Sequence, residues 1–290
     1  MAPAIATHKW RCCAVCGPMP DPTRRGGSEV RADQLLVARQ LAATRSQAQR
    51  LIAAGVRWRL GTGDWQTVRK SGDDIPPDAQ LELLDEAEAR YVSRGGLKLE
   101  GALAATGLDV TGWRCLDVGQ STGGFTDCLL AHGAAHVTGV DVGHGQLHPK
   151  LLADARVTAI ERVNARHLDA SVFAAARPVA GAGSADAAVG FDLIVGDLSF
   201  ISLTLVLPAL APLLAAGGHV LMLVKPQFEL QPEHIGKGGI VRDATLYAQV
   251  EQRLRAACAS CGLAVQHWLP SAIAGGDGNR EFFVHAVQVA

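Results

Sequence analysis

The chain has 290 residues, 48% of them hydrophobic and 19% charged, and its formal net charge is −1. This composition is typical of a folded globular protein and excludes a chain that is disordered throughout. The length suits one large and one small domain, and the near-zero total charge means that affinity for a polyanion would need a local basic surface.

Residues 1–28 are predicted to form an irregular leader, because proline, glycine and cysteine interrupt them. The leader lacks an apolar core of the length found in signal peptides, and nothing in it indicates export. The chain has seven cysteines, an odd number, and Cys115 and Cys128 fall in apolar segments. This usage is typical of a reducing compartment, so we expect a cytoplasmic protein.

Two cysteine pairs have the CxxC spacing of zinc ligands. They are Cys13 with Cys16 in the leader and Cys258 with Cys261 near the end of a predicted helix. A shared four-cysteine zinc site is an alternative, but the leader shows no regular pattern that would position the first pair. We therefore expect no metal.

Residues 29–88 are predicted to form a small α+β domain. Two short helices occupy residues 31–55, and residues 56–84 alternate and turn as a small hairpin sheet does. Ten basic and three acidic side chains lie between residues 24 and 70. Such a surface is typical of a protein that contacts nucleic acid phosphates, although a solvated arginine-rich face is the alternative.

The helix pair of this segment resembles the RNA-binding domain named after ribosomal small-subunit protein four. The residues that carry the resemblance are Arg31, Leu35, Arg45, Ala48, Leu51, Ile52, Gly55 and Val56. The resemblance implies a structured RNA as ligand, bound on the face of the two helices. The candidate RNA-binding residues are Arg31, Arg39, Arg45, Arg50 and Arg57.

Residues 89–290 alternate apolar runs with helical patterns. This predicts an α/β, Rossmann-like domain with a doubly wound, mostly parallel sheet covered on both faces. The expected strands lie near Cys115–Val118, Val137–Asp141, Val157–Ile160, Leu193–Val195, Val220–Val224, Ala264–Trp268 and Glu281–Val287. Residues 174–190 read as a surface insertion. Residues 202–224 could imitate a membrane span, but prolines and glycines divide them into a helix, a Gly-Gly turn and a strand.

A glycine motif follows the first of these strands. Residues 116–125 read LDVGQSTGGF, and Asp141 ends the next strand, where its carboxylate can accept both hydroxyls of a ribose. The combination looks like the S-adenosylmethionine loop of class I methyltransferases. An ordinary turn and an NAD site are alternatives, but the DxGxxxGG spacing differs from the dinucleotide pattern. The candidate cofactor-binding residues are Asp117, Gly119, Ser121, Thr122, Gly123, Gly124, Phe125, Asp141, Val142, Asn164 and Asp197.

Four charged residues fall where a doubly wound sheet delivers side chains to the carboxyl ends of its strands. They are Lys98, Asp197, Lys225 and Glu281. Lys225 directly follows the apolar run Val220–Val224, a costly position unless a carboxylate pairs with it. Methylation of a ribose 2′-hydroxyl requires alignment of the attack and acceptance of one proton, which a lysine can provide. A buried structural ion pair is the alternative.

The same four residues match the Lys-Asp-Lys-Glu tetrad of FtsJ-like RNA 2′-O-methyltransferases. The runs VSRGGLKL, NARHL, GDLSFISL, VKPQFE and GKGGIVRD are similar to the TlyA family, which joins the same two domains in the same order. The resemblance implies S-adenosylmethionine as cofactor and cytidine 2′-O-methylation of ribosomal RNA in ribosomal subunits. It implies that Lys225 is the base or orients the oxygen, that Asp197 and Glu281 hold the lysines, and that Lys98 assists.

Two residues depart from the family's pattern. Gln120 stands where a small residue is usual and could crowd the cofactor or add a hydrogen bond, and Arg280 could compete for Glu281. An RNA-binding ribosome-assembly factor with weak or lost activity is therefore an alternative function. A membrane-active hemolysin is disfavoured, because the sequence has no apolar span and no inserting amphipathic helix. We expect no membrane association and no obligate protein partner.

Overall fold

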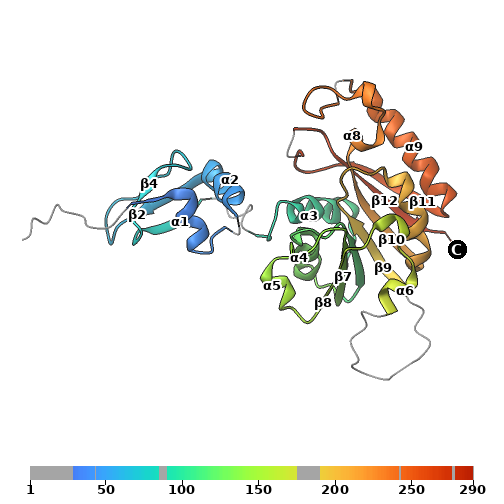
Figure 1. Ribbon diagram of the computed structural model, residues 1–290, viewed down its shortest axis with the longest axis horizontal. Coiled ribbons are helices and arrows are strands. Elements are labelled where there is room, and N and C mark those ends of the chain that lie inside the picture. Colours follow the sequence, from blue (N-terminus) through green and yellow to red (C-terminus); the bar gives the residue numbers. More distant parts are fainter. Residues whose placement is uncertain are drawn as a thin grey trace, which may run out of the picture.

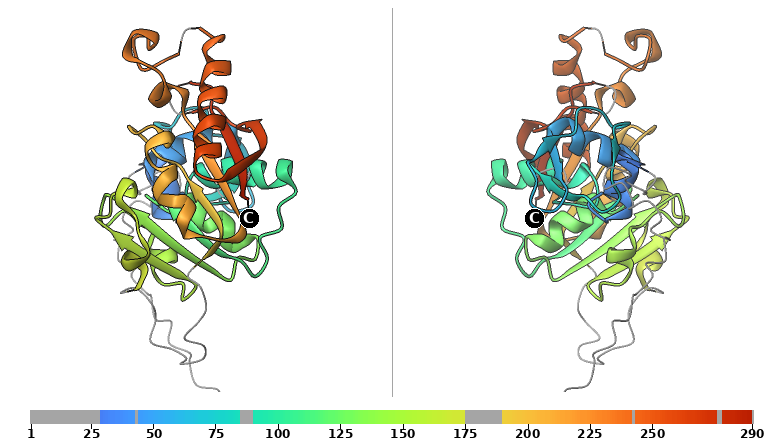
Figure 2. Two further views of the ribbon diagram at one scale, coloured as in Figure 1. Left: turned by 90° about the vertical axis from the view of Figure 1, so that its right-hand side faces the viewer. Right: turned by 90° about the vertical axis from the view of Figure 1, so that its left-hand side faces the viewer.

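The computed structural model describes residues 29–42, 44–84, 90–174, 190–241, 243–275 and 278–289. The predicted leader, with Cys13 and Cys16, and most of the predicted insertion lie outside the described residues. The chain forms a smaller part, residues 29–84, and a larger part from residue 90 onward, arranged along the long axis (Figure 1). Viewed from its end, the molecule shows the smaller, blue part in front of the larger one (Figure 2, right).

The smaller part combines two helices with short strands. Its elements are β1 (Val30–Arg31), α1 (Ala32–Ala38), α2 (Arg45–Gly55), β2 (Val56–Arg59), β3 (Gln66–Thr67), β4 (Asp74–Ile75) and β5 (Gln80–Leu83). β2 pairs antiparallel with β3 and β5, and β1 pairs with β4. The Thr44 side chain caps α2 by accepting a hydrogen bond from the Gln47 N–H (3.2 Å). Two helices followed by a small sheet agree with the prediction.

Both helices pack on one face of this small sheet. Leu51 of α2 and Val56 of β2 are fully buried in the shared core, and Trp58 packs against it. Because successive side chains of a strand point to opposite faces, Arg57 and Arg59 lie on the sheet face turned away from the helices. The smaller part therefore presents two different surfaces that carry arginine, one on the helices and one on the sheet.

In the larger part, the described residues form a seven-stranded sheet in the order β8-β7-β6-β9-β10-β12-β11. The strands are β6 (Arg114–Val118), β7 (His136–Asp141), β8 (Val157–Glu161), β9 (Phe191–Gly196), β10 (Leu214–Val224), β11 (Leu263–Pro270) and β12 (Phe282–Gln288). β12 is antiparallel to β10 and β11, and the other neighbours are parallel. The mostly parallel, doubly wound architecture is thus confirmed.

Helices cover both faces of this sheet (Figure 1). They are α3 (Gly95–Thr106), α4 (Gly124–Ala131), α5 (Pro149–Leu152), α6 (Ala170–Ala174), α7 (Leu207–Leu210), α8 (Pro226–Glu229) and α9 (Leu246–Ser260). On one face, α3, α4 and α5 bury Leu99, Leu129 and Leu151, and on the other face α7 and α9 bury Leu207 and Leu254. With both faces sealed, the ends of the strands are where a ligand can reach polar groups.

The segment 202–224 differs from the predicted helix, Gly-Gly turn and strand. The helix that forms, α7, is short, because Pro208 and Pro212 interrupt a longer one. Gly217 and Gly218 lie inside β10, where its register with β9 shifts. A Cβ at Gly218 would meet backbone oxygens at 2.8 and 2.9 Å, so the glycines form an irregularity within the strand. No helix in the described ranges is long and apolar enough to cross a membrane.

The direction of the winding changes between β6 and β9. From β6 the chain continues outward to β7 and β8, and it then adds β9 on the other side of β6. The loops that leave the carboxyl ends of β6 and β9 therefore diverge. In open α/β sheets the crevice between such loops is where ligands bind.

Candidate active site

The turn after β6 depends on left-handed backbone. Gly119 has φ +81°, and a Cβ there would meet the Asp197 carbonyl oxygen at 3.1 Å. Ser121 has φ +47°, a strained value for a residue with a side chain. The Asp117 carboxylate ties the strand to α4, because it accepts hydrogen bonds from the Thr126 N–H (3.0 Å) and hydroxyl (2.7 Å). Burial raises the pKa of Asp117 to about 7.

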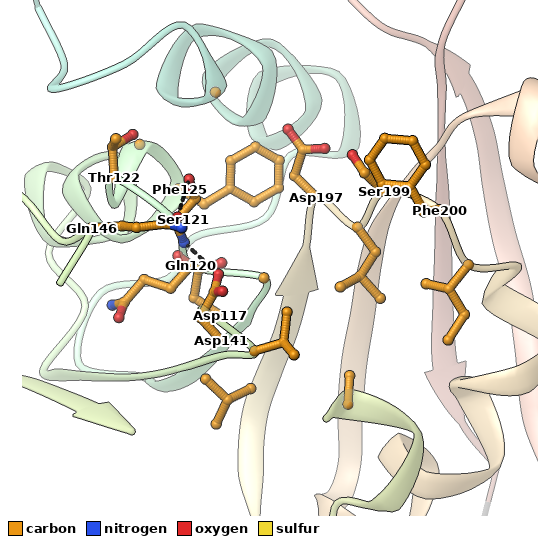
Figure 3. Close-up of a pocket in the computed structure, with 18 of the residues that line it drawn as sticks. Asp117, Gln120, Ser121, Thr122, Phe125, Asp141, Gln146, Asp197, Ser199 and Phe200 are labelled. Atoms are coloured by element: carbon orange, nitrogen blue, oxygen red, sulfur yellow. Dashed lines mark hydrogen bonds between the residues drawn. The ribbon is translucent and has the colours of Figure 1, made fainter. Parts of the chain in front are cut away.

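A cavity of about 700 Å³ lies between this turn and the ends of β7 and β9. Figure 3 shows side chains from both sides of it, with Asp197, Ser199 and Phe200 across from Ser121 and Asp141. Ten predicted cofactor residues line it: Asp117, Gly119, Ser121, Thr122, Gly124, Phe125, Asp141, Val142, Asn164 and Asp197. Its size lies in the range of small-molecule and cofactor sites.

Gly123, the remaining predicted cofactor residue, is not part of this lining. It begins α4 with φ +92°, and a Cβ there would meet the Leu151 side chain at 2.3 Å, so it allows the turn to approach α5. The cavity also includes Gln146, which accepts a hydrogen bond from the Ser121 hydroxyl (3.3 Å). Gln146 is uncharged and outside the glycine motif, so the sequence pattern gave no signal for it.

Carboxylates dominate the charged lining of the cavity, which consists of Asp117, Asp141, Asp197 and Lys225. Asp141 accepts hydrogen bonds from the Ser121 N–H through Oδ2 (2.8 Å) and from the Gly143 N–H through Oδ1 (2.7 Å). Because a carboxylate oxygen can accept two hydrogen bonds, each oxygen keeps one position for a ribose hydroxyl. The lining therefore fits a group that carries a ribose and a positive charge, as S-adenosylmethionine does.

Gln120 is accommodated by a glycine on the neighbouring strand. Its buried side chain lies over Gly139 of β7 and donates a hydrogen bond from Nε2 to the Thr126 hydroxyl (2.9 Å). A Cβ at Gly139 would lie 1.9 Å from Gln120 Cδ. Of the two consequences expected for this residue, crowding or an added hydrogen bond, the hydrogen bond is present.

The four predicted catalytic residues come from distant elements and converge. Lys98 of α3 pairs with Glu281, with 2.6 Å between Nζ and Oε2, and Lys225 pairs with Asp197, with 2.6 Å between Nζ and Oδ1. Lys98 Nζ also lies 3.9 Å from Asp197 Oδ2, which joins the two pairs. The side chains of Lys98 and Glu281 are 9% and 3% exposed. Charges held so far from water need one another as partners.

A second cavity, of about 370 Å³, adjoins the first one. Ser199, Phe200 and Lys225 line both cavities, and Lys98 and Glu281 line the second. Lys225 thus stands between a compartment that fits a cofactor and a smaller compartment, and its Nζ donates a hydrogen bond to the Ser199 hydroxyl (2.8 Å). This arrangement can hold a methyl donor on one side of the lysine and a nucleophile on the other.

Phe200 stands at the rim of both cavities with 90% of its surface exposed. Its φ of +64° is unusual for an aromatic residue, and its ring centroid lies 5.0 Å from that of Phe228. Backbone strain beside a cavity is typical of a functional position. Phe200 lies inside the motif GDLSFISL, but its exposure is a property of the folded loop that the sequence does not reveal.

The predicted RNA-binding arginines lie on the surface of the smaller part and have partners there. Their contacts are Arg31 and Arg45 to Asp33, Arg39 to the Pro77 carbonyl, Arg50 to the Ser46 carbonyl, and Arg57 to Glu82. Asp33 itself is buried. The hydrogen bond from Arg31 holds the pKa of its carboxyl well below the usual value. Contact of these arginines with RNA stays a prediction.

The predicted competition of Arg280 for Glu281 is not seen, because Arg280 is exposed and Glu281 is buried beside Lys98. For the zinc alternative, Cys258 is buried in α9 and Cys261 follows the end of that helix. The other cysteine pair of the predicted site lies outside the described residues. Among the residues that the structure describes, no three His, Cys, Asp or Glu side chains are placed to hold a metal ion.

Comparison with known proteins places this site in a family. The FtsJ-like methyltransferase family matches residues 91–288, which contain the tetrad and both cavities. The chain is also 41% identical over 254 residues to the 16S/23S rRNA (cytidine-2′-O)-methyltransferase TlyA of Mycobacterium tuberculosis, with 88% of each chain covered. The chain belongs to the TlyA family of FtsJ-like methyltransferases.

Two further similar proteins each match most of the chain. A candidate rRNA methyltransferase of Bacillus subtilis, YqxC, is 42% identical over 255 residues, which is 88% of this chain and 84% of the relative. The structure of a hemolysin candidate from Streptococcus thermophilus is 40% identical, covers 90% of this chain and 89% of its own, and superposes with a TM-score of 0.67. S-adenosylmethionine is the cofactor of this methyltransferase family, in agreement with the larger cavity.

Proposed function

We propose that this TlyA-family chain transfers the methyl group of S-adenosylmethionine to the 2′-hydroxyl of a cytidine in ribosomal RNA, in the context of a ribosomal subunit. The observation that carries the proposal is the position of Lys225 between the two cavities, paired with Asp197. The M. tuberculosis relative is named as an enzyme of 16S and 23S rRNA cytidines, which supports the choice of substrate.

The larger cavity would hold the cofactor. Asp141 would accept the ribose hydroxyls, and the aspartates of the lining would favour the positive charge. When bound, S-adenosylmethionine supplies a methyl group on a positively charged sulfur, and its transfer to the 2′-oxygen breaks the carbon–sulfur bond and the 2′ O–H bond. The remaining work of the chain is to align that oxygen and to remove its proton.

Lys225 would perform this work. It orients the 2′-oxygen and, in its neutral form, receives the proton. Asp197 fixes the Lys225 amine at 2.6 Å, and Ser199 holds it from a second side. Lys98 and Glu281 pack behind Asp197 as a second ion pair, so the carboxylate between the two lysines keeps one position. Asp197, Lys98 and Glu281 would thus have positioning roles, and Lys225 alone would contact the substrate oxygen.

The smaller cavity would receive the target nucleotide. Its volume of about 370 Å³ suits one nucleoside better than a base pair, so the target would leave its stack to enter. The exposed ring of Phe200 stands at the entrance, where it can stack on the extruded base.

The division of labour follows the two parts of the chain. We propose that the domain at residues 29–88 binds RNA through its arginines and that the domain at residues 89–290 carries out the transfer, with residues 1–28 as a leader. The positive charge of the smaller part supports this assignment. A ribosomal substrate would place the protein in the cytoplasm.

The test is transfer of tritiated methyl groups from S-adenosylmethionine to ribosomal subunits from cells that lack the enzyme, followed by mapping of the methylated nucleotide by mass spectrometry. We expect label at a cytidine 2′-oxygen and none with Lys225→Ala. The variant should still bind S-adenosylmethionine in calorimetry, which separates lost chemistry from lost folding. Wild-type protein that binds ribosomal RNA and labels none of it would contradict the proposal and favour an assembly factor.

A further inference from the structure

The sheet of the smaller part carries a polar face that is distinct from the helix face. Val56 and Trp58 of β2 point into the core under α1 and α2, as do Leu81 and Leu83 of β5. The alternating residues of the same strands, Arg57, Arg59, Gln80 and Glu82, form the opposite face. The RNA-binding resemblance concerns the face of the two helices, and of the residues on this sheet face only Arg57 is among the predicted RNA-binding residues.

On this face two guanidinium groups lie over one indole ring. The Arg57 Cζ is 5.0 Å and the Arg59 Cζ 4.5 Å from the centroid of the Trp65 ring, which lies in the turn before β3. Each arginine is also fixed through its Nε, Arg57 to Glu82 (2.5 Å) and Arg59 to Gln80 (2.9 Å). A ring below and a strand partner at one end hold both planar groups in defined orientations before any ligand arrives.

The terminal nitrogens of these two arginines remain available. Within the described part of the chain, no hydrogen bond is made by the Nη groups of Arg57 or Arg59. A guanidinium has four N–H donors on its Nη atoms, in the fork geometry that matches phosphate oxygens. Arg69 and Lys70, both exposed, follow β3 and add to the positive charge of the smaller part.

We propose that the cluster Arg57–Trp65–Arg59 is a second RNA-contacting surface, which grips backbone phosphates on the sheet side while the helix side contacts another segment. The inference rests on the proposed function, because it takes structured RNA as the substrate. Two contact surfaces on opposite faces suit a folded RNA that surrounds the smaller part. The orientation of the arginines by Trp65 distinguishes this surface from a solvated charged face, where such side chains would be mobile.

The experiment measures binding of the full chain to protein-free 16S and 23S rRNA and to isolated 30S and 50S subunits, over a range of salt concentrations. We expect Arg59→Gln to weaken binding to both the RNA and the subunits about fivefold and to reduce the slope of log K against log salt by about one. Arg59→Lys should keep the slope but not the affinity, since it keeps the charge without the fork. Trp65→Leu should weaken binding as well, because both arginines lose their support.

The matched control is Arg255→Gln, which removes the same charge from α9, where Arg255 pairs with Glu251 (2.8 Å). It should bind as the wild type does. In steady-state methylation, the Arg59 and Trp65 variants should raise KM for RNA and leave kcat unchanged. Thermal unfolding of each variant checks that the domain is still folded.

Wild-type affinity for RNA in folded Arg59→Gln and Trp65→Leu variants would overturn the inference, as would a loss confined to subunits while protein-free rRNA binds normally, since that would indicate a ribosomal protein as partner. Absence of methyl transfer by the wild type would instead refute the proposed function. The RNA affinities of the variants could still be compared with that of the wild type in that case. Failure of the inference can therefore be distinguished from failure of the proposed function.

Discussion

The two parts of the molecule hold their ion pairs in opposite ways. In the larger part, Lys98 and Glu281 come from elements far apart in the sequence and both are almost inaccessible to water. In the smaller part, Asp33 is equally buried, but its partners Arg31 and Arg45 are 44% and 57% exposed. When both partners are buried, neither charge can be solvated by water if the other partner is removed. An exposed arginine that loses its partner can still be solvated.

The difference in burial predicts two different costs when one member of an ion pair is removed by mutation. Removal of one member of a buried pair leaves an uncompensated charge inside the protein, which costs about 3–5 kcal/mol. Removal of Asp33 leaves two arginines that water can solvate, so its cost is limited to the lost hydrogen bonds. Changes in the tetrad should therefore alter stability and chemistry together, whereas changes around Asp33 should alter stability and the RNA contacts of Arg31 and Arg45 without altering the chemical step.

Asp197→Asn should have the largest effect, because Asp197 is the carboxylate that contacts both lysines. Without its charge the two ammonium groups would repel each other, and Lys225 would lose its orientation. We expect kcat for methyl transfer to fall about thousandfold. Single-turnover labelling at saturating cofactor and RNA measures this. An unchanged kcat would show that the tetrad is a structural ion cluster.

Glu281→Gln should lower the free energy of unfolding by about 3 kcal/mol, because Lys98 would lose its close partner in a buried position. The double variant Lys98→Met/Glu281→Leu removes both charges and should recover most of that stability while remaining inactive. Denaturant unfolding and methylation assays on the two variants sharpen the comparison. If the double variant is both stable and active, this pair does not serve the reaction.

Asp33→Asn should lower the free energy of unfolding by about 1–2 kcal/mol and leave kcat at saturating RNA unchanged. The pKa of Asp33 is lowered in the fold, so its stabilisation is present above the ordinary pKa of 3.8 and is lost as the pH falls below it. The variant should therefore lack part of the acid-induced loss of stability. Unfolding curves at several pH values measure this, and a changed kcat would contradict the separation of the two parts.

A third arrangement buries an ionisable group without charge. His285 of β12 lies between His219 of β10 and His267 of β11, with 3.0 Å between ring nitrogens on each side, and Trp113 stacks on His219. Burial, and then the two neighbouring histidines, lower the pKa of His285 to about 4. The fold therefore keeps this histidine neutral.

The smallest expected effect is a pH dependence of stability that arises from the histidine column, the row formed by His219, His285 and His267. Since the unfolded chain binds a proton near the ordinary pKa of 6.5 and the fold does so near 4, stability should fall as the pH drops from about 6.5 toward 4. In His285→Leu the dependence in this window should be weaker. Thermal unfolding across the window measures it, and identical slopes in both proteins would show that the His285 ring is protonated as easily in the fold as in water.

Much of the fold follows from local patterns in the sequence. Short runs rich in apolar residues indicated every strand of the large sheet, and the signal was strongest for central strands such as Val220–Val224, which are buried on both faces. Lys225 was noticeable because a charged residue directly after a buried strand is unusual, and the resemblance to FtsJ-like methyltransferases grouped it with Lys98, Asp197 and Glu281. The apolar runs and the charged residue after a strand are both local sequence patterns, so they can be recognised without knowledge of the tertiary structure.

The remaining features depend on contacts between distant segments. Gly123 looked like a cofactor residue because it shares the motif of Gly119, but its environment is α5. The exposure of Phe200 follows from its left-handed backbone, and an aromatic residue in the sequence does not indicate that conformation. The histidine column arises from the pairing of β10, β11 and β12, and register of this kind cannot be read from separate strands.

The Gln120 side chain occupies the space that a Cβ at Gly139 would need, so the effects of substitutions at the two positions should depend on each other. Gly139→Ala alone would drive a methyl group into the amide, whereas Gln120→Ala alone would leave a void, so each substitution should be harmful in isolation and tolerated beside the other. The order of the two substitutions therefore should not matter, because only the pair restores the packing. The long amide at this position is thus accommodated by the glycine on β7, and it keeps its hydrogen bond to Thr126.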